Sequence, residues 1–196
     1  MLSVSDRRKL QIEFARNEGA ISHMYLDSKG YVTVGVGHLL KSVGDAQKVA
    51  FLDNKTKKKA TADEIKIDYE NVKKQPKNRV ASFYKSHTKL FLDRLTIDTL
   101  TNEHIDKFYN DLKIIYPNFD SYPEEVRLAL FDLIFNVGKE GLRSTWPTFN
   151  AAIKAKDWKK AADNSSRASP VAPSRNKYVK DLLEKAAKND SKPKKP

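Results

Sequence analysis

Apolar residues recur at helical spacing over most of the chain, and one stretch breaks this pattern. Leu10 and Phe14 give the period of a first amphipathic helix, and Gly19 is suited to end it because glycine adopts a left-handed backbone without strain. Residues 31–36, Tyr-Val-Thr-Val-Gly-Val, are instead rich in β-branched residues and follow a glycine-containing turn at 28–30. The pattern therefore predicts a helix followed by a β-hairpin.

Helical patterns continue through the rest of the chain. The stretches 61–64 and 121–124 both match the capping box, in which a hydroxyl residue is followed three positions later by glutamate. Residues 126–135 are apolar nearly all round, which predicts a central core helix ending at Gly138. Leu90-Phe91-Leu92 fits a strand or a buried connector. Further helices are expected within 43–52, near Val80–Tyr84, from Thr101, from Trp146, from Asp157 (with Trp158 in the core) and over 176–188.

These elements predict an α+β fold that is mostly helical. We expect one domain over residues 1–188, with a small lobe at about 19–60 and a helical lobe at about 61–188 that includes the N-terminal helix. Residues 189–196 are polar and proline-rich and are expected to form a disordered basic tail.

Composition narrows the function classes. The chain has 196 residues, 37 Lys and Arg against 25 Asp and Glu, a net charge of +12 and no cysteine. The charge favours polyanions, and the lack of cysteine excludes disulfides and thiol chemistry. No apolar run has the length of a membrane span, and residues 1–7 lack the apolar core of a signal peptide. Synthesis in the cytoplasm is therefore expected.

Two carboxylates stand at the predicted helix–hairpin junction. Glu18 lies at the helix end, Asp27 lies nine residues later on the hairpin, and the hydroxyl of Thr33 lies across that hairpin. Two carboxylates facing one space are the minimum equipment for cleaving a glycosidic bond. Surface carboxylates that are merely solvated are the alternative for either residue alone.

The spacing of this stretch resembles the active-site pattern of the phage-type lysozymes, glycoside hydrolases that cut peptidoglycan. The matching positions are Glu18, Gly19, Asp27, Gly30, Thr33, Gly35, Gly37, His38 and Leu39. The resemblance implies a two-lobed lysozyme-like fold. It also implies that Glu18 is the general acid and that Asp27 and Thr33 position the attacking water.

The resemblance extends to the second half of the chain. It places Leu39, Phe135 and Asn164 where the family contacts the sugar chain, with Asn136 nearby. It places Arg175 where the family has an arginine beside the catalytic glutamate. From the residues alone, Asn136 either satisfies buried backbone groups or faces a cleft, and composition favours the first.

His38 and Gly30 are expected to support the site rather than to react. His38 follows Gly35-Val36-Gly37 and could serve as a base, but a hydrogen bond that locks the hairpin is favoured. Four scattered histidines and no cysteine give no metal-ligand spacing, so neither a metal nor a cofactor is expected.

Residues 54–100 are longer than the phage enzymes allow between their lobes. This extra segment, together with the chain end near Arg175, is similar to the lysozyme-like domains of toxin effectors that bacteria inject into rivals. A bacteriolytic effector and a phage endolysin therefore both stay open, acting in the target's periplasm or cell wall after delivery or lysis.

The expected partners are peptidoglycan glycan strands and an immunity or inhibitor protein, and the protein is expected to be a monomer. A non-catalytic peptidoglycan-binding module is the alternative function. Nucleic-acid binding is the second rival, but acids interleave with the basic residues and no nucleic-acid motif is recognised.

Overall fold

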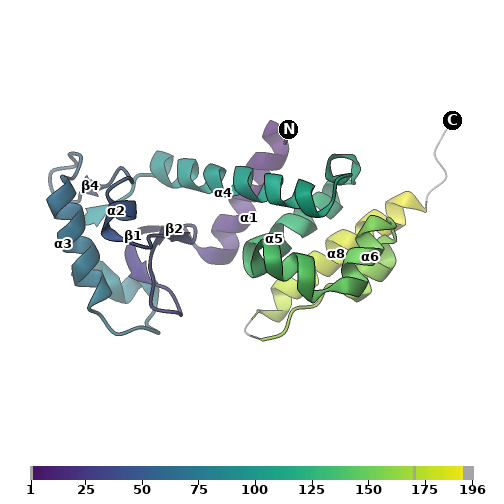
Figure 1. Ribbon diagram of the computed structural model, residues 1–196. Helices are drawn as coiled ribbons and strands as arrows, with labels where there is room; N and C mark the ends of the chain where they lie inside the picture. Colours follow the sequence, from purple (N-terminus) through teal and green to yellow (C-terminus); the bar gives the residue numbers. More distant parts are fainter. Residues whose placement is uncertain (1, 170, 192–196) are drawn as a thin grey trace. The chain divides into compact units, whose positions relative to one another are not determined.

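The computed structural model describes residues 2–169 and 171–191, except for the side chains of Asn17 and Glu18. The chain forms two compact units (Figure 1). The first, here called the sheet unit, comprises residues 11–103. The second, the helical unit, comprises residues 1–10 and 104–196. The chain is α+β and mostly helical, as predicted.

A small antiparallel sheet is the centre of the sheet unit. It has the order β1 (Ile21–Leu26), β2 (Val32–Gly35) and β3 (His38–Leu39). Thr33 pairs with Tyr25 on one side and with Leu39 on the other. All four residues of β2 are buried, because neighbours cover both faces of this central strand. The predicted hairpin is confirmed.

Short elements complete the sheet unit. The predicted helix over 43–52 is wrong, because helical structure stops after one turn and Leu52 pairs with Phe91 in a second, two-stranded sheet. Of the two alternatives for residues 90–92, the strand is therefore correct for Leu90 and Phe91. The elements are α2 (Val43–Ala46), β4 (Leu52–Asp53), α3 (Ala62–Lys73), the 3-10 helix η1 (Ala81–His87), β5 (Leu90–Phe91) and the first half of α4 (Arg94–Ile115).

Residues 61–103 belong with the sheet, whereas the prediction placed them in the helical lobe. Helix α3 packs on β1 and β2, and η1 packs on β1. His23 Nε2 lies 2.8 Å from the carbonyl oxygen of Ala81, and Leu92 N donates to the Ser22 carbonyl at 2.7 Å. The edge strand β1 is therefore covered by η1 and by the segment that follows it.

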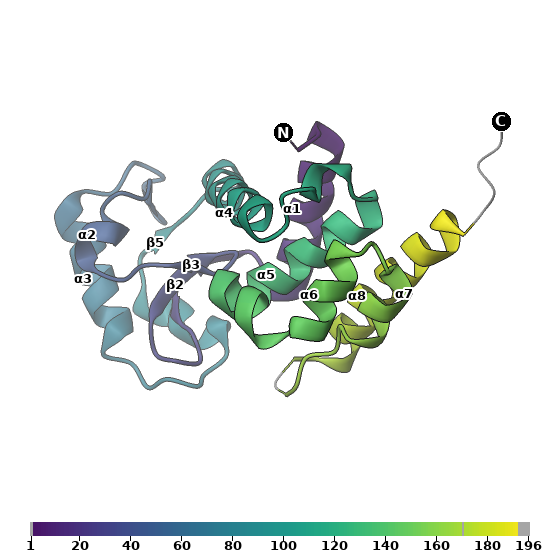
Figure 2. The same cartoon turned by 45° about the vertical axis from the view of Figure 1, so that its right-hand side comes forward.

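Helix α5 (Glu124–Thr145) forms the core of the helical unit, as predicted. Its residues Val126, Leu130 and Phe131 have no exposed surface. The helix breaks at the predicted Gly138, where φ is +73°, and a second helical piece continues to Thr145. Figure 2 shows α5 beside α6 (Pro147–Lys154), α7 (Trp158–Asp163) and α8 (Pro173–Asp190), and Trp158 is buried as expected.

Three helix starts differ from the predictions. Helix α4 begins at Arg94 rather than Thr101, because Asp93 accepts a hydrogen bond from Thr96 N at 2.8 Å and caps it. Ser121 closes the short 3-10 helix η2 (Phe119–Ser121), so the second capping box does not form. Helix α8 starts at Pro173, three residues before the predicted start.

The start of the disordered tail predicted for residues 189–196 is wrong, because residues 189 and 190 are helical. Helix α8 continues through Asp190, while residues 192–196 lie outside the described residues. Over residues 2–169 and 171–191, no helix combines the length and apolar character needed to cross a membrane.

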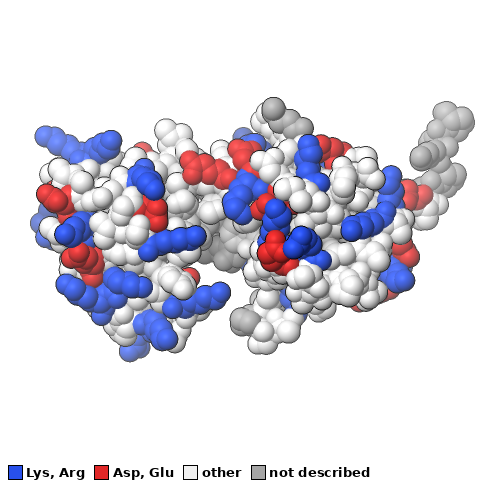
Figure 3. Space-filling view, viewed as in Figure 1, with Lys and Arg blue, Asp and Glu red and all other residues white. Residues whose placement is uncertain are grey.

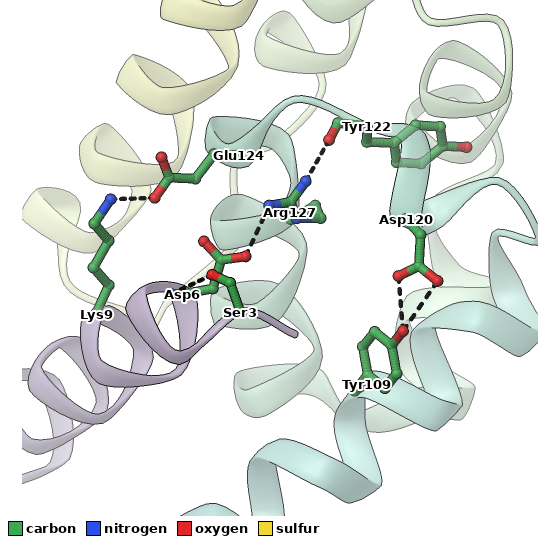
Figure 4. A network of polar contacts seen from close by, with 8 residues as sticks. All are labelled: Ser3, Asp6, Lys9, Tyr109, Asp120, Tyr122, Glu124 and Arg127. Atoms are coloured by element: carbon green, nitrogen blue, oxygen red, sulfur yellow. Dashed lines mark hydrogen bonds and ion pairs between the residues drawn. The ribbon is translucent and has the colours of Figure 1, made fainter. Parts of the chain in front are cut away.

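The first residues of α1 (Val4–Glu18) are fixed in the helical unit by polar contacts (Figure 4). Ser3 Oγ accepts from Asp6 N at 3.0 Å, which caps the helix. Arg127 Nη2 donates to Asp6 Oδ2 at 2.8 Å, and Lys9 pairs with Glu124. The N-terminal helix therefore starts in one unit and ends in the other.

Candidate active site

Glu18 is the last residue of α1, where the sequence predicted a helix end. Gly19 has φ of +74° and donates its N–H to the Ala15 carbonyl at 2.9 Å, which is the usual glycine termination. The Glu18 side chain is outside the described residues, so the position of its carboxyl group is not described. What the structure gives is its place in the chain, three residues before β1 begins.

Asp27 is held by the backbone of its own turn. Its Oδ1 accepts from Lys29 N at 2.9 Å and from Tyr31 N at 2.8 Å. Its backbone N–H donates to the Tyr31 carbonyl at 3.0 Å. Such Asx-type bonds fix the carboxylate through main-chain donors. Among the described residues, Oδ2 receives no hydrogen bond, so it is the oxygen that can accept one from a water molecule.

Thr33 is bonded to the same peptide group as Asp27. Its side chain is buried, and its hydroxyl donates to the Tyr31 carbonyl at 3.1 Å. The Tyr31 carbonyl therefore accepts from both Asp27 N and Thr33 Oγ1, while Tyr31 N donates to the Asp27 carboxylate. Tyr31 thus links the two candidate residues. Sequence reasoning missed this, because the linking groups are backbone atoms that any residue carries.

Gly30 shapes this turn. It has φ of +82°, a conformation that side chains other than glycine adopt only with strain, and it donates to the Asp27 carbonyl at 2.9 Å. Its own carbonyl accepts from Lys73 Nζ at 2.8 Å. The end of α3 is therefore bonded to the turn that carries Asp27.

His38 and Leu39 form β3 and line a pocket of about 420 Å³ within the sheet unit. His38 pairs with Val34 and is half-buried. Burial lowers the pKa of the His38 imidazole below its ordinary value, and the nearby carboxylates of Glu103 and Asp45 oppose this in part. A lowered pKa keeps His38 neutral at pH 7. Its expected role in locking the hairpin stays a prediction.

Arg175 belongs to a buried charge cluster in the helical unit. Its Nε donates to Asp132 Oδ2 at 2.9 Å, and Arg167 Nη1 donates to Asp132 Oδ1 at 2.6 Å. Asn176 Oδ1 accepts from Arg167 N and Nε, at 3.1 and 3.0 Å. Sequence reasoning missed Asp132 and Arg167. The available signal was a carboxylate in an otherwise apolar helix, between Phe131 and Leu133.

The other second-half candidates lie around this cluster or apart from it. Phe135 packs against Phe108, and the guanidinium carbon of Arg175 lies 5.9 Å from its ring centroid. Asn136 is exposed, which does not fit the alternative that it satisfies buried backbone groups. Asn164 is the exposed C-cap of α7, and its Nδ2 donates to the Lys160 carbonyl at 2.8 Å.

The structure thus assembles the candidates into two groups. Thr33, His38 and Leu39 lie in one sheet, with Asp27 in the turn between its strands β1 and β2, and Phe135 and Arg175 are in contact in the helical unit. Within the described part of the chain, no group of three or more His, Cys, Asp and Glu is placed to hold a metal ion.

Comparison with known proteins identifies the family of this chain. The family model of the phage lysozymes matches residues 15–185, which include the helix end, the hairpin and most of the helical unit. No curated protein matches the chain. The matched region contains every candidate residue described above, and it covers far more than half of the chain. The chain therefore belongs to the phage lysozyme family, whose activity is the hydrolysis of peptidoglycan.

Proposed function

We propose that this protein is a muramidase that cleaves the β-1,4 bond between N-acetylmuramic acid and N-acetylglucosamine. The observation that carries the proposal is the hairpin turn of the family-matched region, where Tyr31 links Asp27 and Thr33 through three hydrogen bonds. That turn holds a carboxylate by one oxygen and leaves the other for a water molecule.

Glu18 would supply the proton that the leaving sugar oxygen needs. A glycosidic bond breaks through an oxocarbenium-like transition state, so one carboxylic acid must protonate the leaving group while the opposite face is attacked. Glu18 ends α1 directly before the sheet, and the resemblance of this stretch to the phage-type lysozymes supports the acid role for it. Its carboxyl group must be protonated to act, which burial favours and a nearby arginine opposes.

Asp27 and Thr33 would position the attacking water. Asp27 would accept a proton from the water through Oδ2, while Thr33, whose hydroxyl hydrogen is directed to Tyr31, would offer only an oxygen lone pair. Water attack from the opposite face inverts the anomeric carbon, and it requires carboxyl groups roughly 6.5–9.5 Å apart rather than about 5–5.5 Å. A β-linked strand would then give an α-anomer first.

The sharpest test is Glu18→Gln. The amide keeps the shape of the side chain but is a poor proton donor, so we expect clearing of peptidoglycan suspensions to fall about 100-fold or more. Proton NMR of the first wild-type product checks the anomer before mutarotation. Glu18→Gln activity above a tenth of wild type, with unchanged melting, would contradict the acid role, and an initial β-anomer would contradict water attack.

A non-catalytic peptidoglycan-binding module is the second candidate, because the same hairpin could retain a strand without cutting it. It predicts co-sedimentation with purified peptidoglycan and no release of soluble reducing ends. Release of fragments by wild-type protein but not by Glu18→Gln would exclude it.

The biological setting we propose is bacteriolysis in a target cell, by an injected effector or by a phage endolysin. The segment at residues 54–100 supports the effector, since by the resemblance it is longer than phage-type enzymes allow between their lobes. The genes beside this one distinguish the two. A gene for a small periplasmic inhibitor would identify an effector with its immunity partner, and a holin gene would identify an endolysin.

A further inference from the structure

Positive side chains gather on the sheet unit close to the turn that carries Asp27. Residues 71–92 contain no Asp or Glu. Figure 3 shows Lys and Arg spread over the lower part of the region that α3 and the segment after it occupy in Figure 1. The basic residues of this acid-free stretch are Lys73, Lys74, Lys77, Arg79, Lys85 and Lys89.

Two of these lysines lie directly against the turn. Lys73 Nζ donates to the Gly30 carbonyl and lies 5.6 Å from the centroid of the Tyr31 ring. The side chain of Lys77 packs beside Gly30, where an added Cβ would be 3.7 Å from Lys77 Cδ. The end of α3 and the Asp27 turn therefore form one continuous surface.

Aromatic rings lie between these charges. Tyr31 is 49% exposed, and the guanidinium carbon of Arg79 lies 5.7 Å from the centroid of the partly exposed Phe83 ring. We call this set the basic turn surface. It consists of Tyr31, Lys73, Lys74, Lys77, Arg79 and Phe83.

We propose that the basic turn surface binds a phosphodiester-bearing glycopolymer of the bacterial envelope. The inference rests on the proposed function, and specifically on a target whose cell wall carries such polymers attached to its peptidoglycan. Charges of one sign, with no acid among them over 22 consecutive residues (71–92), fit a ligand that repeats charges of the opposite sign. The exposed ring of Tyr31 suits the apolar face of a sugar unit.

Other ligands fit this surface less well. Peptide stems of peptidoglycan carry amines as well as carboxylates, and the acid-free run at residues 71–92 offers their amines no carboxylate partner of its own. Single-stranded nucleic acid binds through bases that stack on open aromatic faces. Here a cation already lies against each ring, since Lys73 Nζ is 5.6 Å from the Tyr31 centroid and the Arg79 guanidinium carbon is 5.7 Å from the Phe83 centroid.

The expected benefit is local concentration. A polymer held on the basic turn surface would keep the Asp27 turn near the glycan strands to which the polymer is attached, in the manner of a second binding site. The attraction between exposed charges is screened over about 10 Å at 0.1 M salt, so the effect should be large at low ionic strength and small at high.

The test compares two triple variants of the full chain that lose the same charge. The first is Lys74→Gln/Lys77→Gln/Arg79→Gln on the basic turn surface. The matched control is Lys55→Gln/Lys58→Gln/Lys59→Gln, which removes three exposed lysines from the loop between β4 and α3 of the same unit. The probe is purified poly(glycerol phosphate), titrated at several salt concentrations.

We expect wild type and control to bind the probe alike, and the first triple to bind at least about tenfold more weakly at low salt. Its slope of log affinity against log salt should also fall by about two, since each lost phosphate contact removes about 0.7–0.9 in nucleic acid systems. Hydrolysis of soluble, polymer-free glycan fragments and the melting temperature should stay unchanged in both triples.

Several results would overturn the inference. Equal weakening in both triples would show that net charge alone matters, and absence of wild-type binding would remove the site. Tighter binding to single-stranded DNA or to vesicles of acidic phospholipid than to the probe would assign the surface to those ligands. The probe contains no bond that a muramidase cuts, so its binding is measured independently of catalysis. A protein that binds the probe but does not hydrolyse peptidoglycan would therefore count against the proposed function alone.

Discussion

The sheet unit and the helical unit hold their candidate residues by different means. In the sheet unit, Asp27 is fixed by two backbone N–H groups within four residues of it. In the helical unit, Arg175 is fixed by the carboxylate of Asp132, 43 residues away in the chain. A turn built from local backbone bonds can be recognised from the spacing of its residues in the sequence. A buried ion cluster cannot, because its members are far apart in the chain.

The difference also separates stability from chemistry. Replacing Asp27 by its amide removes a charge while the turn can keep its acceptor oxygen. Replacing Asp132 removes the carboxylate that Arg167 and Arg175 both bond, and the Arg167 side chain is 2% exposed. We therefore expect substitutions of Asp27 to lower the turnover rate and substitutions of Asp132 to lower the stability of the fold.

The largest effect is expected for Asp27→Asn. Loss of a positioned base lowers rates by about 10²–10⁴-fold, and the amide oxygen can still accept from Lys29 N and Tyr31 N. Initial rates on peptidoglycan, with thermal melting in parallel, measure this. Thr33→Ala should cost less, because Thr33 only positions the water.

Asp53→Asn is the matched control for Asp27→Asn. Asp53 Oδ1 accepts from Lys55 N at 3.1 Å and from Thr56 N at 2.7 Å, which is the same kind of turn in the same unit. It should keep full activity. Thr33→Ala proving worse than Asp27→Asn at equal stability would reverse the assigned roles.

Asp132→Asn should cost about 3–5 kcal/mol of the free energy of unfolding, because it removes one partner of the buried Arg167–Asp132 ion pair. Asp181→Asn breaks an exposed pair with Lys177 and should cost less than about 1 kcal/mol. Denaturant titration measures both. A loss for Asp132→Asn as small as for Asp181→Asn would show that the cluster does not stabilise the unit.

Gly30→Ala should cost about 1–2 kcal/mol, the strain of a left-handed conformation for a residue with a Cβ. Gly44→Ala is its control, since Gly44 lies in α2 and its nearest contact would be an ordinary 3.7 Å to Ser42 Oγ. That variant should be neutral or slightly stabilised. Chemical denaturation compares them, and equal losses would refute the strain argument.

The smallest expected effect is that His38→Gln makes the stability of the fold less dependent on pH. Because burial lowers the pKa of His38 in the folded protein, the unfolded chain binds the proton more readily. The stabilisation by neutral His38 is complete above the unfolded pKa of about 6.5 and is lost as pH falls through the folded value. Melting between pH 8 and 5 should therefore fall less steeply in His38→Gln than in wild type. An unchanged slope would show that His38 does not titrate differently in the two states.

Local chemistry made much of the fold predictable. Gly19 ended its helix, the capping box at Thr61 formed, and Gly138 broke the core helix because each depends on atoms within a few residues. The start of α4 was missed because Asp93 outcompeted Thr101 as the cap. The strand at Leu52 was missed because its partner, Phe91, lies 39 positions later.

The same limit applies to the candidate site. The positions of Asp27, Gly30 and Thr33 could be named from spacing, since one short turn sets them. The backbone link through Tyr31 could not, because its atoms are common to all residues. The contact of Lys73 with Gly30 joins a helix and a turn 43 residues apart, and no local pattern records it.

The division of α1 between the units has a consequence for how the protein is made. The residues of the sheet unit are contiguous, so a ribosome completes them before it reaches most of the helical unit. The first ten residues cannot form their native contacts until much later in synthesis, because Asp6 bonds to Arg127, which is 121 positions later in the chain. Closing so long a loop slows folding more than it weakens the final state. A fusion at the N-terminus would therefore act on the half of the protein that is synthesised last.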